Sequence, residues 1–145
     1  MLFREDASSL KLDIVNYELP YDGGDPTSDD RNWLVLRATW TQDDGNIIKD
    51  SNSCLLTYEL REMSAGIKVL NAGIRPAYVS EFAEPYFSLS IRAEDDGFRA
   101  EVSFFLPNTM DGDDTAELSC RMSKADMQEL IAELDRLCAK FPDRS

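Results

Sequence analysis

Five segments of the chain alternate between apolar and polar residues, which is the pattern of β-strands that bury one face. They comprise residues 10–14, 33–40, 86–92, 98–106 and 116–122. A short return strand is expected to begin at Ile47-Ile48, after a hairpin turn at residues 43–46, where Asp-Gly favours left-handed backbone. Because each such strand buries only one side, its apolar side must meet a second layer of structure.

Two other segments repeat apolar residues at spacings of three and four, which is typical of amphipathic helices. The first is expected to follow Thr57 as its cap, and Gly66 should weaken it by about 1 kcal/mol relative to alanine. Its apolar stripe consists of Leu60, Met63, Ile67 and Leu70. The second follows Ser123-Lys124-Ala125-Asp126, which has the spacing of a capping box, and Pro142 ends it.

The predicted order of elements is β-β-β-α-(β)-β-β-β-α, in which residues 77–84 are only partly extended. This order favours the α+β class: one antiparallel sheet of about six strands with two amphipathic helices packed on it, as a single domain over residues 1–145. Each helix follows a similar short phrase, Cys54-Leu55-Leu56-Thr57 and Cys120-Arg121-Met122-Ser123. Four residues do not establish a duplicated unit, so this alternative stays open.

The charge of the chain excludes several classes of partner. The 145 residues include 28 Asp and Glu, 15 Lys and Arg and no histidine, which gives a formal net charge of −13. Nucleic-acid backbones and anionic membranes require a basic surface, so neither is an expected partner. A basic protein is the natural electrostatic complement. The absence of histidine excludes Ser-His-Asp and Cys-His catalysis.

The compartment is indicated by the start of the chain and by its cysteines. Residues 1–6 turn acidic where a secretory signal would need a basic start, and no stretch approaches about 20 apolar residues. Cys54, Cys120 and Cys138 are odd in number and lack CxxC spacing, so we expect buried, reduced thiols in the cytoplasm. No cofactor and no metal site is predicted.

Carboxylates are plentiful, so hydrolytic and calcium-binding functions need consideration. A glycosidase requires two carboxylates across a cleft, one of them with a raised pKa. Most of the acidic clusters lie in predicted loops, and Glu59, Glu101 and Glu117 within predicted regular elements lie on the polar side of their patterns, so an enzyme is not expected. The acidic stretches 22–25 and 111–114 offer oxygen ligands but do not fit the EF-hand spacing, and calcium binding is left open.

Much of the acidic excess lies in three predicted loops, at residues 18–30, 94–96 and 111–114. Tyrosines border these loops, and tyrosine beside acidic residues is a common composition of protein-binding surfaces. A solvated loop with a partly packed tyrosine is the alternative. The candidate partner-binding residues are Tyr21, Asp22, Asp25, Asp29 and Asp30, followed by Asp95, Asp96, Asp111, Asp113 and Asp114. They form one recognition face only if the fold brings the loops together.

Several stretches together resemble the small bacterial WapI-like immunity proteins. They are the Asn-Trp-Leu stretch at residues 32–34, Cys-Leu-Leu-Thr-Tyr-Glu at 54–59, Phe-Ala-Glu-Pro at 82–85, and a final helix that closes in Phe141-Pro142. The resemblance spans nearly the whole chain. It departs from the family at Tyr58, where tryptophan is typical, and residues 21–30 follow no family pattern.

The resemblance implies a cytosolic antidote that binds and blocks the toxic C-terminal domain of a polymorphic toxin, often a nuclease. Together with the charge, this predicts a non-enzymatic inhibitor, a monomer or weak homodimer, that docks acidic loops on a basic toxin domain. Its carboxylates would stand in for the phosphates of the substrate. A small acidic scaffold or assembly module without a toxin partner is the alternative, in which the acidity serves solubility.

Overall fold

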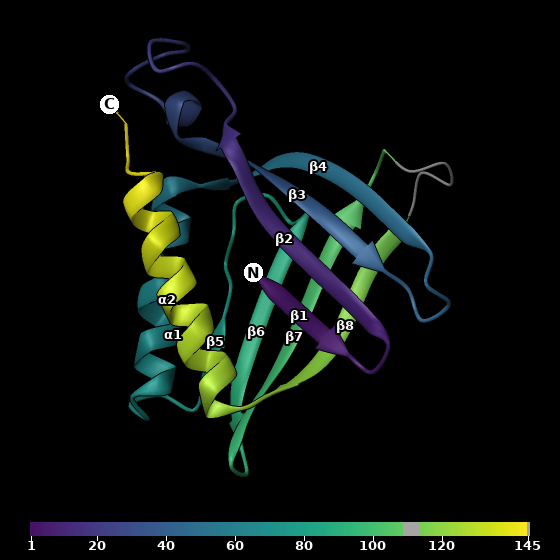
Figure 1. Ribbon diagram of the computed structural model, residues 1–145. Coiled ribbons are helices and arrows are strands. Elements are labelled where there is room, and N and C mark those ends of the chain that lie inside the picture. Colours follow the sequence, from purple (N-terminus) through teal and green to yellow (C-terminus); the bar gives the residue numbers. More distant parts are fainter. Residues whose placement is uncertain (109–113, 145) are drawn as a thin grey trace.

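Two antiparallel sheets of four strands each make up most of the structure, a computed structural model that describes residues 1–108 and 114–144. The first sheet has the order β1-β2-β3-β4 and the second β5-β6-β7-β8 (Figure 1). The elements are β1 (Leu2–Glu5), β2 (Ser8–Tyr17), the short 3-10 helix η1 (Asp29–Asn32), β3 (Trp33–Thr41), β4 (Ile47–Leu56), α1 (Thr57–Asn71), β5 (Ala77–Val79), β6 (Phe87–Glu94), β7 (Gly97–Leu106), β8 (Asp114–Met122) and α2 (Lys124–Lys140).

The α+β class and the antiparallel pairing are confirmed, but the single sheet of about six strands is wrong. The strands β1 and β5 have four and three residues, too few for an alternating pattern to stand out. Residues 49–53 of β4 are all polar, because only part of this strand is covered by other elements. The strand nevertheless runs to Leu56. The described residues therefore form eight strands in two sheets.

Each half of the chain consists of four strands followed by one helix, and in each sheet the strands follow sequence order. The two similar phrases occupy equivalent places: residues 54–57 join β4 to α1, and residues 120–123 join β8 to α2. This arrangement of elements is the one that a duplicated unit would give.

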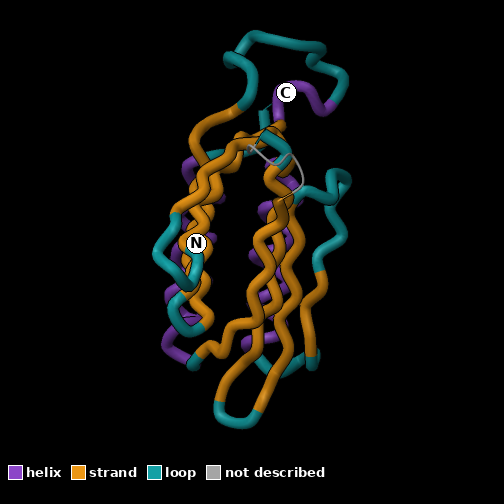
Figure 2. The backbone as a smooth tube through the Cα atoms, turned by 90° about the vertical axis from the view of Figure 1, so that its right-hand side faces the viewer, coloured by secondary structure: helices purple, strands orange, loops and turns teal. Residues whose placement is uncertain are grey.

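The two helices lie beside each other at one side of the sheets, as Figures 1 and 2 show. Buried residues from both sheets and both helices form one hydrophobic cluster, with Phe87 and Phe104 among its largest members. The sheets are also joined directly, since β1 packs against β8. At another junction the buried Asp50 of β4 accepts hydrogen bonds from the backbone and side-chain nitrogens of Asn108, each at 2.9 Å.

The alternation predicted for the strands agrees with the structure, as β3 shows. Leu34, Leu36 and Ala38 are buried, whereas Arg37 between them is exposed. The adjacent Phe104 and Phe105 point to opposite faces, as neighbours on a strand must. Phe104 is in the core, and Phe105 stacks on Tyr86 outside it, with ring centroids 5.7 Å apart.

The starts of the two helices differ. The Ser123 hydroxyl accepts the backbone N–H of Asp126, and the Asp126 carboxylate accepts that of Ser123, so the predicted capping box is confirmed. The predicted cap at Thr57 is wrong, because Thr57 is the first helical residue. Glu59 serves this helix start instead: its carboxylate accepts the backbone N–H of Leu56 at 2.9 Å.

All three cysteines are free, and Cys54 and Cys120 are buried as predicted, whereas Cys138 is only half-buried. Burial raises the pKa of the Cys54 thiol to about 12 and that of the Cys120 thiol to about 11. Both thiols are therefore poor nucleophiles at neutral pH. Within the described residues, no helix has the length and hydropathy that a membrane span needs.

Candidate functional site

The predicted acidic loops do not lie on one face. Residues 18–32, which we call the acidic loop, connect β2 to β3 at the end of the molecule where the C-terminus lies, whereas the β6–β7 turn with Asp95 and Asp96 lies at the opposite end (Figure 1). Asp114 pairs with Leu106 at the far end of β7, so nine residue steps of about 3.4 Å separate it from this turn by about 30 Å. Asp111 and Asp113 lie outside the described residues.

The acidic loop is ordered by its own carboxylates. Asp25 accepts hydrogen bonds from the backbone N–H and the hydroxyl of Thr27, at 2.8 and 2.7 Å, and these lower the pKa of Asp25. The Asp30 carboxylate accepts the backbone N–H of Asp25 at 3.0 Å. Two of the predicted binding residues therefore stabilise the conformation of the loop.

A glycine is required at the centre of the acidic loop. Gly24 has a φ angle of +73°, in the left-handed region that side chains other than glycine rarely adopt. A Cβ atom there would lie 2.6 Å from the Cβ atom of Asp30 and 2.8 Å from a methyl carbon of Leu19. The loop can close on itself only because position 24 has no side chain.

The other candidate residues of the acidic loop point outward. Tyr21 is 74% exposed, and Asp22 and Asp29 are also exposed. Asp29 accepts one hydrogen bond from outside the loop, from the Tyr58 hydroxyl at 3.3 Å. Arg31 donates from Nε to the carbonyl of Gly23 at 3.0 Å, so a cation supports the loop from within. The loop thus presents an aromatic ring and free carboxylate oxygens on a braced backbone.

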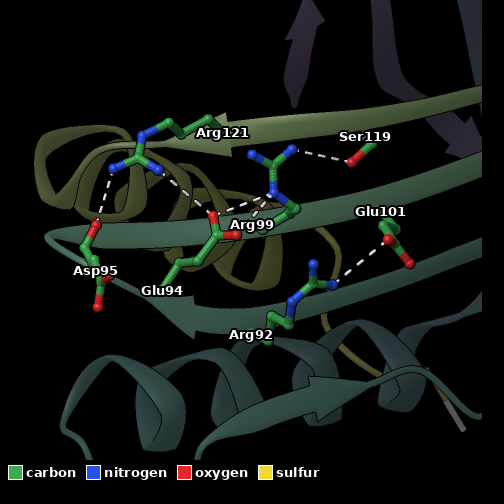
Figure 3. Close-up of polar contacts among 7 residues, drawn as sticks. All are labelled: Arg92, Glu94, Asp95, Arg99, Glu101, Ser119 and Arg121. Atoms are coloured by element: carbon green, nitrogen blue, oxygen red, sulfur yellow. Dashed lines mark hydrogen bonds and ion pairs between the residues drawn. The ribbon is translucent and has the colours of Figure 1, made fainter.

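The β6–β7 turn has a different electrostatic environment (Figure 3). Arg92, Arg99 and Arg121 face one another in a cross-strand row, where like charges would destabilise the sheet without compensation. Glu94 supplies a compensating negative charge: its carboxylate contacts Arg99 Nε at 3.1 Å and Arg121 at 3.6 Å. Arg121 also donates to the backbone carbonyl of Asp95 at 2.9 Å. The turn therefore carries cations beside Glu94 and the Asp95 backbone, which makes it a poorer match for a basic partner.

A hollow of about 530 Å³ lies over the outer face of the second sheet. Small serine side chains form its floor, and Glu5, Glu101 and Glu117 are among its lining residues. Glu101 and Glu117 are exposed, as predicted from the sequence. Both carboxylates are therefore open to water, whereas a general acid works in a closed cleft.

Glu59 departs from its predicted place on a polar face, because it is only 4% exposed. Both carboxylate oxygens are used: one accepts from Leu56 as described, and the other accepts the backbone N–H of Ala83 at 2.7 Å. Hydrogen bonds lower the pKa of the carboxyl groups of Asp25 and Asp143. Among the described residues, no group of three or more potential metal-ligating side chains is present.

Sequence reasoning missed Arg144, which contacts both ends of the acidic loop. Its guanidinium donates to the backbone carbonyls of Leu19 and Arg31, at 2.8 and 2.9 Å. Arg144 lies more than 110 positions from these partners and belongs to no local motif, so a single sequence could not predict these contacts.

Comparison with solved structures shows a shared fold at low sequence identity. The structure of WHY3 from Arabidopsis thaliana is 14% identical, with a TM-score of 0.51 over 97% of this chain and 86% of that chain. The structure of the plant transcriptional regulator PBF-2 is 13% identical, with a TM-score of 0.52 over 97% and 80%. No curated protein matches the sequence.

The family model described as the immunity protein WapI-like family matches residues 1–142. This range covers both sheets, both helices and the acidic loop. It confirms the family resemblance predicted from the sequence. The chain therefore belongs to the WapI-like family of immunity proteins.

Proposed function

We propose that this immunity protein is a non-catalytic inhibitor that binds a basic, nucleic-acid-cleaving toxin domain through its acidic loop. The observation that carries the proposal is the exposure of Tyr21, Asp22 and Asp29 on a loop with five carboxylates. The net charge of −13 gives the whole molecule the sign that a basic partner requires.

The mechanism is occupation of the cationic substrate groove. Exposed carboxylates of the acidic loop take the positions that phosphates of the substrate would take, and the substrate is excluded. The long-range field steers the encounter and can raise association to about 10⁸–10⁹ M⁻¹s⁻¹ at low salt. Tyr21, which is exposed in the free protein, becomes buried in the complex and supplies the aromatic anchor on which tight interfaces often depend.

The internal structure of the acidic loop supports this use. Ordering a loop on binding costs free energy, and a loop that is already ordered avoids that cost. Asp25 and Asp30 fix the backbone through hydrogen bonds, so Asp22 and Asp29 are presented in a defined arrangement. The arginines that contact Glu94 and the Asp95 carbonyl make the β6–β7 turn the weaker candidate.

The experiment first asks whether a neighbouring reading frame encodes a large protein, and then co-expresses the tagged chain with the C-terminal domain of that protein. The proposal predicts that this domain is basic, co-purifies in a 1:1 complex and stops inhibiting growth when the chain is present. A chain that assembles only with itself and leaves the growth inhibition unchanged would instead support the scaffold function.

A further inference from the structure

Arg144 lies at the base of the acidic loop and touches both of its ends. Nη2 donates to the carbonyl of Leu19, just after β2, at 2.8 Å, and Nε donates to the carbonyl of Arg31, just before β3, at 2.9 Å. The guanidinium also covers the ring of Tyr17, 3.7 Å from the ring centroid. One side chain therefore closes the loop across its two stems.

The backbone of Arg144 reinforces this connection. Its N–H donates to Asn32 Oδ1 at 2.6 Å, and its carbonyl accepts from Asn32 Nδ2 at 2.9 Å. The side-chain amide of Asn32 thus pairs with both polar groups of the Arg144 backbone. Nearby, the Tyr17 hydroxyl donates to the carbonyl of Pro142 at 2.5 Å. Residues 142–144, which we call the strap, are hydrogen-bonded to both stems of the loop.

The other side of the strap is anchored on the helices. Asp143 accepts a hydrogen bond from Arg61 of α1. The ring of Phe141, which follows α2 and is buried, meets Tyr17 edge-on with centroids 5.5 Å apart. The strap therefore connects the helices to the acidic loop.

We propose that Arg144 is the positioning residue of the partner-binding loop, which it holds in its binding conformation before the toxin domain arrives. This inference rests on the proposed function of the acidic loop. Arginine suits the task because its planar group donates in several fixed directions and stacks on an aromatic ring at the same time. A lysine at this position can supply the charge but not the fork of two hydrogen bonds.

The position of Tyr21 depends on the same group. The guanidinium of Arg144 covers the ring of Tyr17 at the stem of the loop. The same guanidinium carbon lies 5.8 Å from the centroid of the Tyr21 ring. Tyr21 is largely exposed, so the nearby guanidinium helps to restrict the orientation of its ring. Loss of Arg144 should therefore loosen the proposed anchor as well as the carboxylates.

The test compares R144A and R144K with R136A, which removes the same charge from an exposed position of α2. The first readout needs no toxin: amide hydrogen exchange at Asp25 and Asp30, whose N–H groups donate within the loop. We expect exchange about tenfold faster in R144A, an intermediate effect in R144K and no change in R136A, at nearly equal thermal midpoints.

The second readout is the binding kinetics of the toxin domain that co-purifies with the wild-type chain. R144A should bind about tenfold more weakly, with R136A unchanged. Unchanged loop protection in R144A would overturn the strap, whatever the toxin does. Lost protection with unchanged affinity would overturn the role of Arg144 in binding, while weakened binding of loop carboxylate variants would still support the proposed function.

Discussion

The carboxylate of Glu59 accepts the backbone N–H of Ala83 at 2.7 Å, while its second oxygen accepts that of Leu56 at 2.9 Å. One buried side chain thus joins the start of α1 to the segment that leads into β6. These are two of the stretches on which the family resemblance rests, residues 54–59 and 82–85. In the fold they form one structural unit, although more than 20 residues separate them.

Replacement of Glu59 by alanine is expected to destabilise the protein by about 2–4 kcal/mol, because one buried and one partly buried N–H group lose their acceptors. Chemical denaturation measures the free energy of unfolding. Glu62, one turn further along α1 and exposed, is the matched control, and E62A should change stability by less than about 0.5 kcal/mol. Equal effects of the two substitutions would contradict the role given to Glu59.

Gly66 leaves room for the ring of Tyr78, and a Cβ atom there would lie 2.5 Å from a ring carbon. Helix propensity alone predicts that G66A stabilises α1 by about 1 kcal/mol. The clash predicts destabilisation by about 1–3 kcal/mol instead. Thermal unfolding of G66A and of G66A/Y78A separates the two effects. In the Y78A background the ring is absent, so G66A should stabilise the protein relative to Y78A alone. Destabilisation by G66A in both backgrounds would argue against the clash.

The hydrogen bond from Arg61 lowers the pKa of the Asp143 carboxyl below its ordinary value of 3.8. A lowered folded-state pKa stabilises the protein above the unfolded-state pKa, and this stabilisation is lost as the pH falls through the folded-state value. Both side chains are about half exposed, at 52% and 44%, so the contribution stays below about 1 kcal/mol. D143N should therefore lower the melting temperature at pH 7 but hardly at pH 2. An equal deficit at both pH values would be inconsistent with an ionic contribution.

The three thiols should react in a defined order. Cys138 is half-buried, whereas Cys54 and Cys120 are buried with pKa values of about 12 and 11. At pH 8, iodoacetamide should alkylate Cys138 first, and the other two only in denaturant. Mass spectrometry of peptides from partly labelled protein gives the order. Rapid labelling of Cys54 in the native protein would show that the region between β4 and α1 opens readily.

The elements that alternate over many residues could be predicted from the sequence. The faces of β3 and β7 were predictable because one buried face imposes a period of two, and α2 was predictable from its stripe and its cap. The division into two sheets was not, since it depends on β1 and β5, whose pairing with longer strands is decided by distant contacts. The middle of β4 could not be predicted either, because residues 49–53 are all polar and do not alternate.

The candidate site could be predicted only in part. The composition of residues 18–30 indicated an exposed acidic loop, and the structure places Tyr21 and Asp22 at its surface. The internal roles of Asp25 and Asp30 depend on how the loop turns at Gly24, which composition does not reveal. The contacts of Arg144 are set by where α2 ends relative to the first sheet, which is a property of the complete fold.

The central claim is that exposed carboxylates of the acidic loop steer the chain onto a basic toxin domain. The most direct test is the association rate constant with the co-purified toxin domain for D22N/D29N, which leaves the hydrogen bonds of Asp25 and Asp30 in place. The control D96N/E129Q removes two exposed charges outside the acidic loop, one in the β6–β7 turn and one on α2.

At low salt, D22N/D29N is predicted to associate about tenfold more slowly than wild type, with a weaker dependence on ionic strength, whereas the control stays within about twofold. Equal association rates for wild type and D22N/D29N, or an equal loss in D96N/E129Q, would contradict the assignment of binding to the acidic loop.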